Sequence, residues 1–402
     1  MKGEKVINRI ILIGNGFDLA HGLPTRYVDF INWYCKRRVQ ELETNKTIES
    51  SDILCRFILE RGFYLKGNIM NSWSDVYQYY QKELADKVSA TEFFFHLVED
   101  SELCVCKNSP FFDNICRSIE TKGWVDIENE YYRFLKGIAK NEPGFKSTLK
   151  ELNEQLAYIQ ILLIEYLGSL NKKVPTMKAL KSIIYEPIKP HDISLASLED
   201  LGGCFLTTIN EKEEIYAKIE VRPDNILFII FNYTANAERY CMKKEEFEVH
   251  YIHGELRKPE SVIFGYGDEL DKDYKDILNL NDNEYLRNMK SVKYMESDNY
   301  RIILSFIETA PYQVYIMGHS CGNSDRTLLN TLFEHRNCIT IKPFYHKKED
   351  GTDNYLDLVQ NIIRNFTDMK LMRDRVVNKT FCEPLPQKEA VKSGSSLKAT
   401  FA

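Results

Sequence analysis

Two side chains that could take part in catalysis, a general base and a hydrogen-bonding amide, follow apolar runs in the second half of the chain. Asn232 comes after the run 225–231, and His253 comes after the run 248–252. Imidazole titrates near neutral pH, so His253 could act as a general base. The amide of Asn232 offers a donor and an acceptor, which could hold a ribose hydroxyl or an attacking water. The alternatives are a structural histidine and an asparagine that caps the next helix.

A glycine loop lies near the start of the chain. The segment Gly14-Asn15-Gly16 directly follows the apolar run 6–13 and opens a helical pattern. Two glycines let backbone amides approach a ligand closely, and a helix N-terminus favours a phosphate. The G-x-G-x-x-G of dinucleotide-binding folds does not fit, because position 19 is Leu19. The loop predicts contact with a nucleotide phosphate, with a plain tight turn as the alternative.

Three further positions could contact a ligand. Ser320, in the segment Gly318-His319-Ser320 after the run 313–317, could bind a ribose or a phosphate, unless the segment is only a turn. Asp325 could bind a ribose hydroxyl or cap a helix. Glu128 opens a helix with Trp124 and Asp126, where acidic residues are expected from the helix dipole alone. The functional alternative is that Glu128 reaches from the helical insertion into the ligand-binding pocket and acts there as an additional catalytic residue.

The sequence predicts no metal centre. His250 stands three residues before His253, so on a strand the two point to opposite faces. The ten cysteines include one C-x-C pair, Cys104 and Cys106, and no C-x-x-C. Scattered cysteines of this kind suit free thiols in a reducing compartment.

The first motif extends beyond the glycine loop. The segment Gly14 to Phe30, GNGFDLAHGLPTRYVDF, resembles the signature of the AbiH abortive-infection family of bacterial phage-defence proteins. Other segments are similar to that family as well, namely 124–128, 231–234, His253-Gly254, 264–265 and 318–320 with Asp325. The resemblance implies an antiphage role.

A more distant resemblance implies chemistry. The spacing G-x-G-x5-G-hydrophobic-P, from Gly14 to Pro24, is similar to the first NAD-binding motif of sirtuins. Asn232 looks like the start of their N-x-D motif, and His253-Gly254 looks like their catalytic H-G pair. Residues 259–265 resemble the segment P-x-x-V-x-F-G, and residues 318–320 resemble G-T-S. No cysteine lies between the H-G and F-G segments, so the sirtuin zinc ribbon is absent.

The resemblance assigns roles to residues of this chain. Two departures affect it, because Thr234 stands where sirtuins have Asp and Asp18 stands where they have a small hydroxyl residue. His21 is considered only as a ligand contact. The expected catalytic residues are His253 and Asn232, and the expected NAD-binding residues are Gly14, Asn15, Gly16, Phe17, Asp18, Pro24, Thr234, Gly318, His319, Ser320 and Asp325.

The elements that must position these residues are readable from periodicity. Apolar runs at 6–13, 225–231, 248–252, 261–264, 313–317 and 338–344 predict strands, and helical spacing dominates from about residue 35 to 220. Strands alternating with helices indicate an α/β fold with a parallel sheet. We expect a Rossmann-like, sirtuin-like domain at 1–34 and 221–384, an all-helical insertion or cap at 35–220, and a flexible tail at 385–402.

Composition limits the function classes. The chain has 402 residues, 44% hydrophobic and 28% charged, with a net charge of −6. These values exclude wholesale disorder and disfavour a nucleic-acid partner, which usually requires a basic surplus. No run is long enough to span a membrane, and the apolar run near the N-terminus is too short for a signal peptide. We expect a cytoplasmic protein with a small nucleotide as its partner and a phage-derived trigger, and leave self-association open.

The main hypothesis is an antiphage effector that binds NAD and hydrolyses its nicotinamide–ribose bond. NAD would be the substrate or ligand, and no metal is expected. The first alternative is a nucleotide-binding sensor without catalysis, which Thr234 in place of Asp favours. The second alternative is an effector that acts on nucleic acid, which the charge balance opposes.

Overall fold

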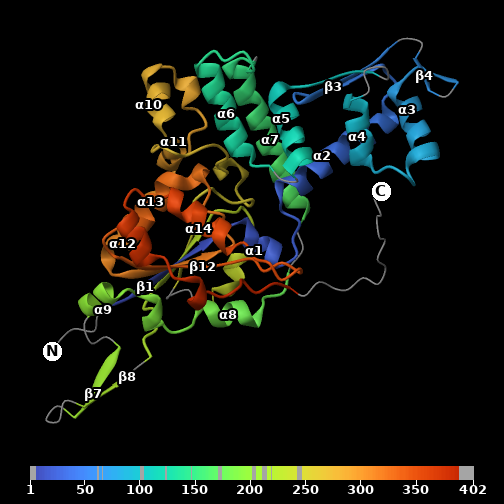
Figure 1. The fold of residues 1–402 in the computed structure, drawn as a ribbon. Coiled ribbons are helices and arrows are strands. Elements are labelled where there is room, and N and C mark those ends of the chain that lie inside the picture. The colour runs from blue at the N-terminus through green and yellow to red at the C-terminus, as the bar shows by residue number, and fades with distance from the viewer. Residues whose placement is uncertain are drawn as a thin grey trace.

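The protein is seen in a computed structural model, drawn in Figure 1. The structure describes residues 6–60, 63–65, 67–99, 104–122, 125–145, 147–170, 174–201, 205–210, 215–218, 220–241 and 247–388. Among these residues, no helix is both long and apolar enough to cross a membrane.

A parallel sheet of five strands forms the centre of one domain. Its strands lie in the order β10, β9, β1, β11, β12, and every neighbouring pair is parallel. Numbered along the chain, this order is 3-2-1-4-5, with the reversal between β1 and β11. The strands are β1 (Asn8–Ile13), β9 (Ile226–Ile230), β10 (Phe247–Tyr251), β11 (Tyr312–Met317) and β12 (Cys338–Phe344).

Helices cover both faces of the sheet, which explains why a central strand such as β9 is a continuous apolar run. Ile10 and Leu12 point into a core shared with α12 (Asn299–Thr309), α13 (Arg326–Glu334) and α14 (Tyr355–Arg364). Ile11 and Ile13 point to the other face, which is covered by α1 (Asn15–Ala20) and α8 (Lys178–Ile184). The sheet domain is therefore a three-layer α/β/α structure, as Figure 1 shows.

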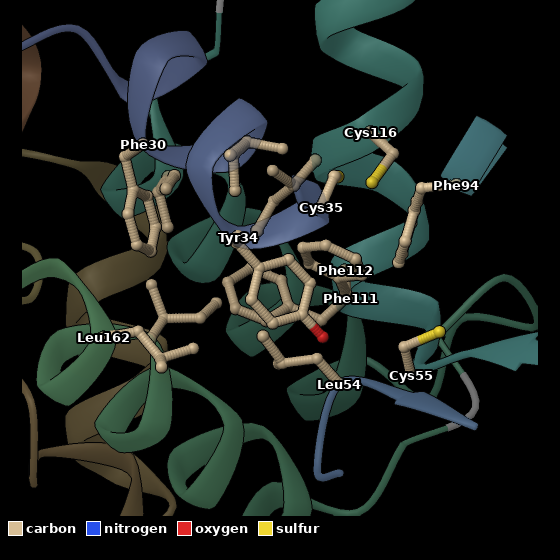
Figure 2. Close-up of a cluster of buried hydrophobic side chains, with 14 of the residues drawn as sticks. Phe30, Tyr34, Cys35, Leu54, Cys55, Phe94, Phe111, Phe112, Cys116 and Leu162 are labelled. Carbon is tan, nitrogen blue, oxygen red and sulfur yellow. The ribbon is translucent and has the colours of Figure 1, made fainter. Parts of the chain in front are cut away.

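A second lobe has its own core, separate from the sheet. Its main helices are α2 (Tyr27–Glu41), α3 (Trp73–Tyr79), α4 (Ala90–Glu99), α5 (Pro110–Lys122), α6 (Ile127–Ala139) and α7 (Leu149–Ser169). Figure 2 shows part of this core, where Tyr34, Phe94 and Phe112 come together from three helices. The segment 256–290 contributes as well, because Phe264, Tyr266 and Ile277 belong to the same cluster.

The lobe is not all-helical, which corrects the expected fold class. Antiparallel strands β2 (Glu49–Ser51), β3 (Cys55–Leu59) and β6 (Cys104–Asn108) form a small sheet. Along β3 exposure alternates, with Cys55 and Phe57 buried and Arg56 exposed, which is the period of a strand with one solvated face. The short hairpins β4 (Phe63–Leu65) with β5 (Asn68–Met70), and β7 (Leu206–Asn210) with β8 (Ile215–Lys218), are also strands inside the range expected to be helical.

Two other expectations differ from the structure. Residues 261–264 do not form a strand, because the amides of Ser261 and Val262 donate within the turn, to the carbonyls of Lys258 and Pro259, and only the Ile263 amide bonds beyond it, to the carbonyl of His253. The start of the expected tail is held in place, since Leu385 is buried and its amide donates to the carbonyl of Tyr345. Residues 389–402 lie outside the described part of the chain. The remaining helices are α9 (Leu195–Leu201), α10 (Lys272–Asn279), α11 (Lys290–Lys293) and α15 (Met369–Arg375).

Candidate functional site

The carboxyl ends of β1, β9, β10 and β11 meet along one edge of the sheet, which we call the rim. Because all these strands are parallel, the residues that follow them converge there. The Gly16 amide donates to the carbonyl of Gly318 at 2.8 Å, joining the β1 and β11 ends. His253, after β10, has its Nδ1 3.1 Å from the carbonyl oxygen of Phe231, after β9. Segments far apart in the chain thus form one site.

The glycines of the rim serve the close approach of two backbones. A Cβ on Gly14 would lie 2.4 Å from His319 Cα, and a Cβ on Gly16 would lie 2.8 Å from Gly318 Cα. Gly318 has φ +75°, and a Cβ there would lie 2.1 Å from the nitrogen of Phe17. The two loops can pack this closely only because they carry no side chains at these positions. Phosphate contact by this loop stays a prediction.

Asp18 organises the loop after β9. It is buried, and its carboxylate accepts hydrogen bonds from Asn232 Nδ2 at 2.7 Å, Thr234 Oγ1 at 2.6 Å and Asn236 Nδ2 at 3.1 Å. Burial raises the pKa of Asp18, and the three donors oppose that rise. The Oδ1 atom of Asn232 is buried and has no hydrogen-bond partner among the described residues. Asn232 is therefore fixed through its amide nitrogen, which leaves its acceptor oxygen available.

A buried group of charges lies beside these residues. We call Glu128, Lys290, Asp325, His253 and His319 the rim cluster. Lys290 Nζ lies 3.0 Å from Glu128 Oε2 and 2.8 Å from Asp325 Oδ1. Asp325 Oδ1 is also 3.0 Å from His253 Nε2, and its Oδ2 is 3.5 Å from His319 Nε2. The cluster joins α6 of the lobe to the edge of the sheet.

The hydrogen bonds determine which ring nitrogens carry protons. His253 Nδ1 faces a carbonyl, which only accepts, so Nδ1 carries hydrogen and Nε2 is the nitrogen that titrates. Nε2 lies 3.2 Å from the Tyr294 hydroxyl as well as near Asp325. His319 Nδ1 accepts from the amide of Cys321 at 2.9 Å, so its hydrogen is on Nε2. A proton accepted by His253 would form an imidazolium that Asp325 stabilises.

The environment separates the ionisation of the two carboxyl groups. Burial, only partly offset by Lys290, raises the pKa of Glu128 to about 7. Burial also acts on Asp325, but Lys290 and His253 outweigh it and hold the pKa of Asp325 well below its ordinary value. Burial lowers the pKa of His253, as does Lys290, while Asp325 opposes them. Near neutral pH, Asp325 is therefore ionised, and Glu128 is the carboxyl group of the two that exchanges a proton.

Several residues predicted to contact a ligand make contacts within the protein, and their ligand roles stay predictions. Phe17 is buried in the core under the sheet, and Asn15 bonds to Thr25 in the turn before α2. His21 is buried, with its ring nitrogens near the Phe17 carbonyl and the Tyr240 hydroxyl. The Pro24 carbonyl accepts from Tyr166 at 2.6 Å.

The rim and the start of α6 hold the other predicted residues. Ser320 is exposed at the rim, and Asp126 caps α6 by accepting from the Asn129 amide. Trp124 lies outside the described residues.

Sequence reasoning missed Lys290 and Tyr294. Both come from the segment after α10, whose mixed polar composition gave no signal of burial. Only the 0% exposure of the Lys290 side chain and its two carboxylate partners identify it. Among the described residues, no group of His, Cys, Asp and Glu side chains has the arrangement of a metal site.

Comparison with known proteins gives one assignment. No curated protein and no solved structure matches the chain significantly. The family model described as "Bacteriophage abortive infection AbiH" matches residues 10–346, from the first strand of the sheet to just beyond the last. The chain therefore belongs to the AbiH family of bacteriophage abortive infection proteins.

Proposed function

We propose that this AbiH protein fulfils its abortive-infection role in the cytoplasm by hydrolysing the nicotinamide–ribose bond of NAD. The observation that carries the proposal is the convergence of His253, Asn232, Asp325 and Glu128 at one edge of a parallel sheet. The strand order 3-2-1-4-5 is that of dinucleotide-binding sheets, whose ligands bind beyond the carboxyl ends near the reversal. The ordered likeness to sirtuin motifs supports the same substrate.

The rim cluster has the groups that this reaction requires. Water attacks the ribose carbon, the bond to nicotinamide breaks, and the products are nicotinamide, ADP-ribose and one proton. The positive charge that develops on the ribose favours nearby carboxylates, which Asp325 and ionised Glu128 provide. The free oxygen of Asn232 would accept from a ribose hydroxyl or from the water. His253 Nε2 would receive the proton, in contact with Asp325.

Purified protein incubated with NAD tests the proposal. Free nicotinamide and ADP-ribose are quantified by chromatography for the wild type, His253→Ala and Asn232→Ala. Loss of a general base lowers such rates by about 10²–10⁴-fold, which is the expectation for His253→Ala. His250→Ala is the matched control, because His250 lies on β10 and bonds to Asn299 outside the rim cluster. Equal nicotinamide release by wild type and His253→Ala would exclude this mechanism.

One observation favours a second function, a nucleotide sensor without catalysis. Both ring nitrogens of His253 are engaged by protein groups, so neither one faces open space. Thr234, where sirtuins have Asp, is also occupied by Asp18. A sensor would bind NAD tightly in calorimetry while releasing no nicotinamide, whereas the hydrolase releases it continuously.

A further inference from the structure

Lys290 supplies the buried ammonium of the rim cluster. It opens α11, and its side chain is 0% exposed. Its amide donates to the Tyr266 carbonyl at 2.8 Å, and the Tyr266 amide donates to the Asn288 carbonyl at 3.1 Å. A Cβ on Gly267 would lie 2.9 Å from Lys290 Cβ, so the chain passes closely on that side as well. Lys290 is thus held by a hydrogen bond at its amide and by the close approach of Gly267 at its Cβ.

The ammonium of Lys290 contacts carboxylates from two parts of the molecule. Glu128 belongs to α6 of the lobe, and its other oxygen, Oε1, accepts from the Gly265 amide at 3.1 Å. Asp325 precedes α13 of the sheet domain and contacts both histidines of the cluster. Lys290 therefore connects the lobe to the sheet edge at the position where the chemistry is proposed.

Charge within the cluster explains how Lys290 acts. With both carboxylates ionised, one ammonium and neutral imidazoles leave the cluster with one excess negative charge. A single added proton, on Glu128 or on His253, makes it neutral. Without the ammonium, two buried carboxylates would face each other, and one of them would be protonated. The titratable groups facing Glu128 are Lys290, Asp325 and Asp126 and the phenols of Tyr27, Tyr233 and Tyr294, with His253 and His319 beyond Asp325.

We infer that Lys290 is a positioning residue for the NAD hydrolysis proposed above: its ammonium holds Glu128 and Asp325 together beside His253 Nε2. The inference rests on the proposed function. Lys290 acts through the two carboxylates. Its loss therefore changes the ionisation of Glu128 and the stabilisation of the His253 imidazolium together.

The test compares Lys290→Met with the wild type in the pH profile of nicotinamide release. Methionine keeps an unbranched chain and removes the charge. We expect kcat at pH 7 to fall about tenfold or more, KM to change less, and the acid limb of the profile to move to higher pH, since Glu128 stays protonated longer. Lys293→Met is the matched control, because Lys293 lies on the same helix and pairs with Glu296 at the surface.

A second measurement does not depend on activity. Carboxyl carbon NMR of ¹³C-glutamate-labelled protein, assigned with Glu128→Gln, follows Glu128 directly, and its titration should move to higher pH in Lys290→Met. If Lys290→Met does not fold, the double variant Lys290→Met/Asp325→Asn removes one carboxylate with the ammonium, and it is compared with Asp325→Asn alone, so that the difference between the two in Glu128 titration reports the effect of Lys290.

The outcomes separate the two proposals. A wild type that releases no nicotinamide overturns the proposed function and this inference with it. A wild type that hydrolyses NAD, with an unchanged pH profile and an unchanged Glu128 titration in Lys290→Met, overturns this inference alone.

Discussion

The rim cluster and a second buried group of charges, on a face of the sheet, have similar burial but different origins. In the second group, Lys342 Nζ lies 3.0 Å from Asp192 Oδ2, and both side chains are 0% exposed. Arg9 donates to Gln313 Oε1 at 3.0 Å and to the Ile184 carbonyl at 2.8 Å. We call Arg9, Gln313, Lys342 and Asp192 the face cluster.

The face cluster is fixed by the sheet itself. Arg9 is paired with Gln313 in the register of β1 and β11, and the cover comes from the single segment 184–192. The rim cluster instead draws its members from loops and from helices of two lobes. It also contains two imidazoles, and a carboxyl group, Glu128, whose pKa is raised to about 7. Burial and ion pairing alone therefore do not distinguish the two clusters, whereas position at the strand ends and the raised pKa of Glu128 do.

The largest effect on stability is expected from Lys342→Met. It leaves Asp192 buried without its cation, which costs about 3–5 kcal/mol in the free energy of unfolding. Chemical denaturation measures this loss, and Asp192→Asn added to Lys342→Met should recover part of it. Nicotinamide release per folded molecule should stay at the wild-type level. A fall in that release as large as for Lys290→Met would remove the distinction between the two clusters.

Substitution of Gly318 tests how tightly the rim loops are packed. Gly318→Ala places a methyl group 2.1 Å from the Phe17 nitrogen at φ +75°. Left-handed backbone costs an alanine about 1–2 kcal/mol, and crowding adds about 1–3 kcal/mol. Gly351→Ala is the control, because Gly351 has φ +85° but no atom within 4 Å of its Cβ position. Denaturation midpoints that fall equally in both variants would mean that the rim loops can separate without cost.

The sheet and its edge could be predicted from the sequence because their signals are local. A run such as 226–230, buried on both faces, is continuously apolar, and a polar residue such as His253 directly after a strand must lie at the edge. In the structure His253, Asn232 and Asp325 lie at this edge, and Glu128 reaches it from α6.

The remainder of the site depends on contacts that no local pattern encodes. Lys290 is buried only because residues 128 and 325 supply two carboxylates, and neither is near it in the chain. The glycines at 14 and 16 predict that another group comes close to the backbone there. They do not tell whether that group is a phosphate or a second backbone, because both require the absence of a side chain. The role of Asp18 could not be predicted for the same reason, because its carboxylate accepts from three donors that lie more than 200 residues away in the chain.

Asp18→Asn should have a smaller effect than the two substitutions above. An asparagine has one acceptor oxygen and turns an amide toward donors, so hydrogen bonds to a charged group are lost at a cost of about 1.5–3 kcal/mol. Asn232 would lose its anchor, and nicotinamide release should fall with it. Asp374→Asn, where the residue is exposed and its carboxylate accepts from the Ser194 hydroxyl, should change stability by less than about 0.5 kcal/mol. Unchanged stability and release in Asp18→Asn would show that Asp18 does not position the rim.

The smallest effect is expected in the pH dependence of stability, to which Glu128 of the rim cluster should contribute. The pKa of Glu128 is about 7 when folded and near its ordinary value of 4.5 when unfolded. Between these values the folded state binds more protons, so the stability contributed by this group falls as pH rises from about 4.5 to 7. Glu128→Gln removes that dependence, although it loses the pair with Lys290 at every pH. Its melting temperature relative to wild type should therefore rise by a few degrees between pH 5 and pH 8, whereas exposed Glu154→Gln should show a flat difference. A flat difference for Glu128→Gln as well would mean that Glu128 titrates like a surface carboxyl group, and the rim cluster would then differ from the face cluster only in its position.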